Sequence, residues 1–182
     1  VFACGTFYQA GVATVIALAA IYAQQVMGFQ TRETILLILV VNVTAALGAF
    51  GFGYVQDRIG KVPALRVTLF AWLAMILAAW LATTPAAFWV AANLAGLAMG
   101  SSQSAGRALV AYFSPPERSA EFFGMWGVAT RLASIPGPVT YGAVTCVTGG
   151  NHRLALLATG VFFLLAIALL AAADERRGHA AA

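Results

Sequence analysis

The stretch Gly53-Tyr54-Val55-Gln56-Asp57-Arg58-Ile59-Gly60-Lys61 is charged, and it lies between two long apolar runs at about 34–55 and 67–83. Apolar runs of about 20 residues are typical of helices that cross a bilayer, because a helix rises about 1.5 Å per residue and the hydrocarbon core is about 30 Å thick. The stretch therefore predicts a charged hairpin at a membrane surface, with spanning helices on either side of it.

The glycines and charged residues of this hairpin each have a physical interpretation. Gly53 would let one helix approach its neighbour closely, and Gly60 would permit a sharp reversal of the chain. Asp57 would lie against the positive end of a nearby helix, while Arg58 and Lys61 would place positive charge beside lipid headgroups. The alternative is a generic basic loop without a role in function.

The composition is that of an integral membrane chain. The 182 residues are 62% hydrophobic and 9% charged, with a mean hydropathy of +0.88, whereas soluble domains have roughly 25% charged residues. The net charge of +4 does not indicate nucleic-acid binding, because the basic residues are placed between apolar runs. We therefore expect the lipid bilayer as a partner, and no nucleic acid.

The apolar segments predict an all-α membrane protein with six spans in one bundle. The spans are expected at about 1–28, 34–55, 67–83, 86–113, 122–147 and 154–173, and a polar cytoplasmic tail at 174–182. Pro136-Gly137-Pro138 interrupts the fifth span, and Ser114-Pro115-Pro116 ends the fourth, because proline cannot continue a helix. The first residues resemble neither a signal peptide nor a polar leader, so we expect the chain to begin inside a larger protein.

Six spans place both ends of the chain on one side of the membrane, and the basic residues predict which side. Basic residues are enriched in cytoplasmic loops. One set of loops and ends holds Arg58, Lys61, Arg66, Arg118, Arg176 and Arg177, and the opposite set holds only Arg32 and Arg153. Both ends are therefore expected in the cytoplasm, in a multi-pass protein of the cell (inner) membrane.

The cysteines and histidines suggest no redox or metal chemistry. Cys4 and Cys146 are expected on opposite faces of the bilayer, so no disulfide joins them. Neither cysteine has the spacing of a metal site. His152 and His179 fall in expected loops or tails, and each is interpreted as a solvated surface residue.

Arg131 is the most unusual residue of the expected spans. It lies about nine residues into the fifth span, roughly 13 Å below the surface. A buried arginine usually faces the bundle interior or a water-filled cavity. It would either bind an anionic group of a substrate or pair with an acid of a partner helix. All the acidic residues lie at expected helix ends: Glu33, Asp57, Glu117, Glu121, Asp174 and Glu175.

Two uncharged polar residues are further candidates for a substrate path. Gln103 lies in the polar run Ser101-Ser102-Gln103-Ser104, and Asn42 lies near the middle of the second span. Both could donate and accept hydrogen bonds with a substrate. The glycines around Gln103 are interpreted as helix-packing positions. Arg107, four residues beyond Gln103, would reach headgroups by snorkelling or make a gating contact.

The pattern Gly-x-x-x-Asp-Arg-x-Gly-Lys resembles the loop signature of the major facilitator superfamily of secondary transporters. Over nearly its whole length the chain is similar to the C-terminal six-helix half of the "unknown major facilitator" family, relatives of fungal autophagy-linked vacuolar amino-acid effluxers. The resemblance rests on Phe7-Tyr8-Gln9-Ala10-Gly11, the 53–61 hairpin, the 100–107 segment, Glu121-Phe122-Phe123-Gly124 and Asp174-Glu175-Arg176-Arg177-Gly178.

This resemblance implies one half of a twelve-helix fold, with the N-terminal six-helix half as a missing partner. It also implies that Asp57 and Arg58 act as locks between the halves in one state. Two residues depart from the family pattern, because an acidic residue commonly stands at the place of Ala10 and a serine at that of Gly106. If the acid that commonly stands at the place of Ala10 takes part in ion coupling, this half of the chain lacks it.

A transporter explains the hairpin, the six spans and Arg131 together, and we expect a small polar solute, with amino acids among the candidates, to move by alternating access. A membrane enzyme would need a nucleophile with a base, or a metal cluster, at membrane depth, and the sequence offers neither. No cofactor or metal is expected. The remaining alternative is a non-transporting scaffold, which would bury Arg131 in a dry, paired environment.

Overall fold

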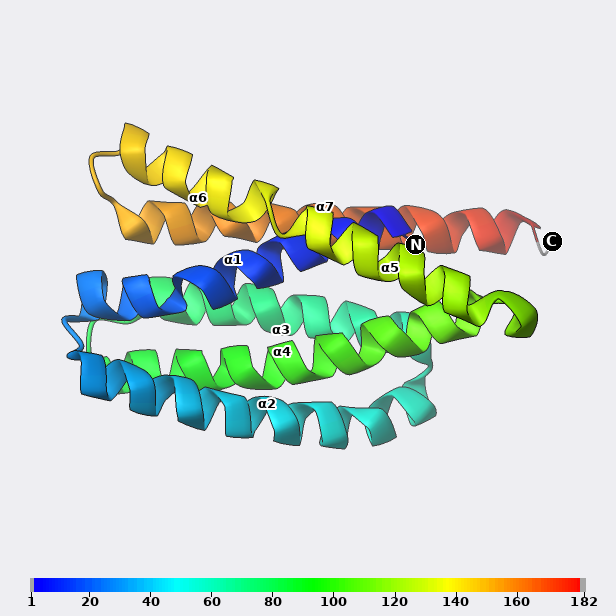
Figure 1. Ribbon diagram of the computed structural model, residues 1–182, viewed down its shortest axis with the longest axis horizontal. Helices are drawn as coiled ribbons and strands as arrows, with labels where there is room; N and C mark the ends of the chain where they lie inside the picture. The colour runs from blue at the N-terminus through cyan, green and yellow to red at the C-terminus, as the bar shows by residue number, and fades with distance from the viewer. Residues whose placement is uncertain (1, 181–182) are drawn as a thin grey trace.

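A computed structural model describes residues 2–180, with side chains described for residues 4–171. Within these residues the regular structure is helical throughout (Figure 1). The elements are α1 (Phe2–Met27), α2 (Thr31–Ile59), α3 (Lys61–Leu81), α4 (Pro85–Phe113), the 3₁₀ turn η1 (Pro116–Arg118), α5 (Ser119–Ala133), α6 (Pro136–Val147) and α7 (His152–Ala180).

The helices form one bundle with two ends. The Phe29 end is defined here by the links at residues 28–30, 82–84 and 148–151, and the Gly60 end by the links at residue 60 and at 114–118. Helix α2 packs mainly on α4, α3 packs on both α4 and α7, and α1 packs on α7. The start of α1 and the end of α7 lie toward the Gly60 end (Figure 1). An even number of crossings brings the two ends of a chain to the same side.

Four helices are long and apolar enough to cross a membrane: Cys4–Met27, Thr31–Ile59, Lys61–Leu81 and His152–Ala171. The expected spans at 86–113 and 122–147 are not in this set. Helix α4 has 29 residues but includes the polar run at 101–104, and α5 and α6 have only 15 and 12 residues.

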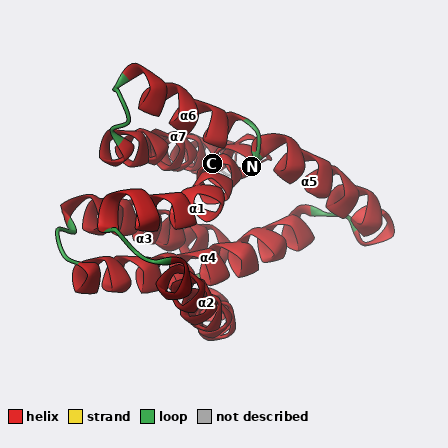
Figure 2. Cartoon of the chain, turned by 60° about the vertical axis from the view of Figure 1, so that its left-hand side comes forward, coloured by secondary structure: helices red, strands yellow, loops and turns green. Residues whose placement is uncertain are grey.

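The expected fifth span is thus two helices in succession, which follow one another along the same side of the molecule (Figure 2). Helix α5 ends at Ala133, and α6 begins at Pro136. Proline lacks the N–H that would continue the hydrogen-bond ladder of α5, so the helix is interrupted at this point.

Two other helix ends differ from the expected ends of the spans. Between the spans expected at 34–55 and 67–83, only Gly60 lies outside a helix, because α2 continues to Ile59 and α3 starts at Lys61. Helix α7 continues to Ala180, so the part of the expected polar tail that the structure describes is helical as well.

Helices α2 and α4 approach closely at glycines. A Cβ on Gly96 would lie 2.6 Å from the carbonyl oxygen of Val41, and a Cβ on Gly100 would overlap the carbonyl oxygen of Ala45. Small residues that let backbones touch are a common means of packing membrane helices. The interpretation of these glycines as packing positions is confirmed.

The interior joins α3, α4 and α7 through Trp72. Its ring stacks on that of Phe163 with centroids 5.2 Å apart, and its indole nitrogen donates a hydrogen bond to the hydroxyl of Ser102 at 3.3 Å. Because Trp72 is only 1% exposed, this hydrogen bond keeps its one polar group satisfied inside an apolar core.

Candidate functional site

A cavity of about 160 Å³ lies between α1, α2 and α4, with walls also from α3, α6 and α7. Among the described side chains none that lines it is charged. Its floor includes Trp72 and Met75, and its rim includes the exposed residues Ile16 and Ile38. The cavity is therefore suited to an uncharged or apolar group rather than to an isolated ion.

Three hydroxyl groups in the cavity wall are already engaged. Thr14, Thr34 and Thr159 each donate to the backbone carbonyl four residues earlier in the chain, at 2.7, 3.1 and 3.1 Å. Asn42 donates from Nδ2 to the carbonyl of Ile38 at 2.8 Å. The side-chain oxygen of Asn42 has no partner among the described residues, so it remains an acceptor on this wall.

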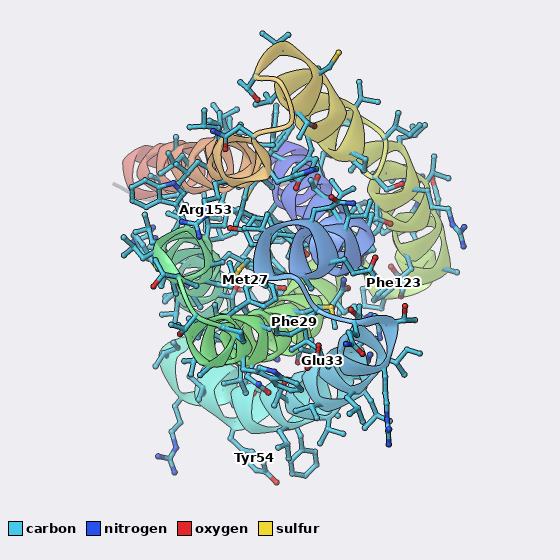
Figure 3. The ribbon with its side chains drawn as sticks, turned by 90° about the vertical axis from the view of Figure 1, so that its left-hand side faces the viewer. Met27, Phe29, Glu33, Tyr54, Phe123 and Arg153 are labelled. Atoms are coloured by element: carbon cyan, nitrogen blue, oxygen red, sulfur yellow. The ribbon has the colours of Figure 1, made fainter. Side chains whose placement is uncertain are left out.

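Aromatic rings close the cavity at the Phe29 end, onto which Figure 3 looks. Tyr22 stacks on Phe88 with centroids 5.5 Å apart, and Phe29 meets the same ring edge-on at 5.8 Å. The Tyr22 hydroxyl donates to the carbonyl of Ala79 at 3.2 Å. Gly28, with φ of 70°, turns the chain so that Phe29 points back onto this cluster.

Arg131 lies on the exposed side of α5, away from the cavity wall. Its guanidinium has no hydrogen bond or ion pair within the described part of the chain. Its neighbours Val128, Leu132 and Ile135 are large apolar residues that are 59–62% exposed. Within this chain Arg131 is thus neither buried nor paired, in contrast to the environment that a scaffold would give it.

The structure does not bring the three expected path residues together. Only Asn42 lines the cavity, whereas Gln103 is half-buried elsewhere on α4 and Arg131 is exposed on α5. The gating candidate Arg107 is also exposed. The neighbouring Gly106 lies against the hydroxyl of the fully buried Tyr8, with no room for a Cβ between them. This contact gives a physical reason for glycine at 106.

At the Gly60 end, the hairpin residues have few partners. Gly60 has φ of 88°, a conformation that glycine adopts without strain. Asp57 and Arg58 are exposed, and neither has a partner among the described residues. No described atom lies within 4 Å of a Cβ built on Gly53, so the expected close helix approach at Gly53 is not made within this chain.

Sequence reasoning missed one contact of this hairpin. The Lys61 ammonium lies 5.4 Å from the centroid of the Tyr112 ring, a cation–π contact between the start of α3 and the end of α4. The residues are 51 positions apart, and only the packing of α3 on α4 brings them together.

His152 differs from the expected solvated surface residue, because it is half-buried. Its Nδ1 lies 3.1 Å from the hydroxyl of Tyr141, a residue of the cavity wall that is 4% exposed. Next to it, Arg153 donates to the carbonyls of Trp80 and Ala82 at 3.5 and 3.0 Å. The side chain of the other histidine, His179, falls outside the described side chains.

The two cysteines are both free, with Cys4 buried and Cys146 exposed. The thiol of Cys4 donates to the carbonyl of Ala166 at 3.2 Å, a contact between α1 and α7. Among the described side chains, no group of three or more His, Cys, Asp or Glu residues could hold a metal ion.

Residues 5–182 match the family described as "Vacuole effluxer Atg22 like". The chain is 27% identical over 169 residues to the Uncharacterized MFS-type transporter YxiO of Bacillus subtilis, covering 93% of this chain and 39% of that protein. It is 26% identical over 189 residues to Autophagy-related protein 22 of Cryptococcus neoformans, covering 95% of this chain and 34% of that protein. The chain spans less than half the length of these relatives. Because the family match covers nearly all of its residues, the chain belongs to the vacuole effluxer Atg22-like family.

Proposed function

We infer that this chain is the C-terminal six-helix half of a twelve-helix transporter, and that the complete protein moves a small polar solute by alternating access. The family match and the MFS-type relative support this function, and both point to a transporter and not an enzyme. The share of the relatives that this chain covers leaves room for a second bundle of similar size. Helix α4 and the α5–α6 pair would supply the two crossings beyond the four most apolar helices.

The environment of Arg131 is the observation that carries this proposal. A guanidinium among exposed apolar residues is costly if that surface faces lipid. The cost falls if the surface faces water or an acidic group of the second bundle. The exposed face of α5 around Arg131 is therefore proposed as part of the surface between the two halves, where an anionic group of the solute would bind.

The other two path residues would act at separate points. Asn42 offers a free amide oxygen in the cavity wall, and Gln103 offers an uncharged amide on α4. A solute that moves between the halves would meet these groups in turn. Alternating access needs such weak, successive contacts, because a solute that is bound too tightly at one point is not released.

The exposed charges at the Gly60 end are proposed as a gate. Asp57, Arg58 and Arg107 are all exposed and unpaired within the described residues, so they are free to contact the second half when this end closes. Gly53 belongs to the same surface: its open side could receive a helix of the second half. Gly60 and Lys61 would hold the hairpin in position.

The bilayer is proposed to be the cell membrane, with both ends of this segment in the cytoplasm. The free, exposed Cys146 tests this orientation because it lies near the Phe29 end. A membrane-impermeant maleimide added outside intact cells should label Cys146 in a complete protein whose other exposed cysteines are replaced. Cys146→Ser is the control, and labelling only after the cells are opened would reverse the orientation.

Transport is tested with the complete protein in proteoliposomes, against a panel of labelled amino acids and small organic anions. Arg131→Ala should abolish uptake of the transported member, and Arg131→Lys should restore part of it by returning the charge. Arg118→Ala is the matched control, because Arg118 is paired with Glu121 at 2.8 Å. Wild-type uptake by both Arg131 variants would exclude a charge contact at this position. Absence of uptake for every panel member would exclude these solute classes.

A further inference from the structure

The hydrogen bond between Tyr141 and His152 connects the cavity wall to the Phe29 end of the bundle. The Tyr141 ring comes from α6 and lines the cavity, and its hydroxyl lies 3.1 Å from Nδ1 of His152, the first residue of α7. The ring of Tyr141 is 4% exposed, while His152 is half-buried beside the turn at Gly149 and Gly150. The imidazole is thus within reach of water on one side and bonded to a cavity residue on the other.

The direction of this hydrogen bond depends on the protons of the imidazole. A neutral imidazole that carries its hydrogen on Nε2 accepts the Tyr141 hydroxyl hydrogen at Nδ1. When a proton from the aqueous phase binds at Nδ1, both ring nitrogens become donors. The Tyr141 oxygen must then accept the bond, and the hydroxyl hydrogen must turn away from His152.

We propose that His152 is a proton-binding site whose occupancy decides whether the Tyr141 hydroxyl can donate a hydrogen bond at the cavity. A buried donor without an acceptor is costly. The protonated state is therefore favoured when an acceptor reaches Tyr141, either from a neighbouring side chain or from a bound molecule. Protonation of His152 would therefore favour binding of an uncharged group with a hydrogen-bond acceptor, since no described charged residue lines the cavity.

Few other ionisable groups lie near this pair on the helices that pack against it. Arg153 follows on α7, where its guanidinium donates to the carbonyls of Trp80 and Ala82, and Cys146 is exposed on α6. Helix α1 contributes Tyr22, which interacts electrostatically with Tyr141 and donates its own hydrogen to Ala79. The charged residues of α3 lie in its first two turns, at the opposite end. Among these groups the His152 imidazole is the one that bonds the Tyr141 hydroxyl directly, so it is the group at this corner whose protonation reverses that bond.

The Tyr22 oxygen is one acceptor that the chain itself offers on the same cavity wall, and Tyr22 interacts electrostatically with Tyr141. Because Tyr22 donates its hydrogen to a carbonyl, its oxygen keeps lone pairs that can accept the freed hydrogen of Tyr141. Proton binding would then change a hydrogen bond between α6 and α7 into a link that reaches α1. Both Tyr22 and Tyr141 line the cavity, so its wall changes with the charge of His152.

The experiment is infrared difference spectroscopy on the complete protein in lipid, comparing pH 8 with pH 5. The C–O stretch of a tyrosine differs between a phenol that donates and one that accepts, and ring-labelled tyrosine identifies the band. Wild type should show one tyrosine band that shifts with pH, and both His152→Gln and Tyr141→Phe should lose that shift. His179→Gln should keep it and serves as the histidine control.

A side chain at 152 that can only donate a hydrogen bond provides a second test. This test predicts a particular tyrosine band and does not rely on the loss of a shift. His152→Lys should give the low-pH tyrosine band at both pH values, because an ammonium can only donate. A thermal unfolding curve for each variant identifies those that remain folded. No shifting band in the wild type, or a shift that persists in folded His152→Gln, would overturn the assignment.

Discussion

The indole nitrogen of Trp72 donates to the hydroxyl oxygen of Ser102, 3.3 Å away, and thereby ties α3 to α4 in the middle of the bundle. Ser102→Ala should destabilise the protein by about 1 kcal/mol, since the buried N–H loses its acceptor. Ser101→Ala is the matched control, because the Ser101 hydroxyl bonds only to carbonyls of its own helix. Unfolding of the complete protein in detergent measures both, and an equal loss in the two variants would contradict the role of the Trp72 bond.

The contact between α2 and α4 should fail when Gly100 gains a side chain. A Cβ at this position overlaps the carbonyl of Ala45, so the helices must separate, and overpacking of this kind costs about 1–3 kcal/mol or more. Gly100→Ala should therefore lower the midpoint of thermal unfolding. Gly51→Ala on α2 has no described atom near its new methyl group and should be neutral or gain up to about 1 kcal/mol of helix propensity. A stable Gly100→Ala variant would show that the helices are less close than described.

Gly106→Ser tests the close contact between Gly106 and Tyr8. The new Cβ would meet the Tyr8 hydroxyl, and Tyr8 cannot move easily because its ring packs 6.3 Å from that of Trp126. We expect reduced stability, with partial recovery when Tyr8→Phe is added, because phenylalanine lacks the clashing oxygen. Gly124→Ser, which meets no described atom within 4 Å, is the control. Absence of recovery in the double variant would place the strain elsewhere.

Arg153 caps the C-terminal end of α3 from the first turn of α7. Without its two hydrogen bonds, the carbonyls of Trp80 and Ala82 lose their side-chain partner, and the favourable interaction with the helix dipole, about 0.3–1 kcal/mol, is lost. Arg153→Ala should therefore speed hydrogen exchange of the amides around 80–84. Arg153→Lys keeps the charge but loses the forked geometry, so its exchange should be intermediate. Unchanged exchange in Arg153→Ala would mean that water replaces the guanidinium without cost.

The apolar runs of the sequence, and the prolines and glycines that interrupt them, predicted most of the helices but not how the helices pack. Apolar runs placed the long helices within a few residues, because the cost of leaving backbone groups unsatisfied in lipid makes a helix the only solution for such a run. The Pro136-Gly137-Pro138 signal correctly marked an interruption, since proline acts locally. The length of the hairpin could not be predicted, because a single residue in the left-handed region, Gly60, suffices to join two helices.

The candidate site was less predictable because it depends on contacts between distant residues. Asn42 lines a cavity, and sequence alone offered only its polarity and its depth in a span. The contact between Tyr141 and His152 joins two helices, and no local pattern distinguishes that histidine from a solvated one. Conversely, Gly53 was assigned a packing role on a motif, while Gly96 and Gly100 make the close contacts of α2 with α4.

The one-residue link at Gly60 sets a mechanical limit on the bundle. A chain reaches at most about 3.6 Å per residue, so the Cα atoms of Ile59 and Lys61 cannot separate by more than about 7 Å. Because α2 and α3 also pack on the same helix, α4, a displacement of any one of the three is transmitted to the other two. The α5–α6 pair, interrupted at Ser134 and Ile135, is not held by the one-residue link at Gly60. Force applied to the bundle would therefore deform the α5–α6 joint before it separates α2 from α3.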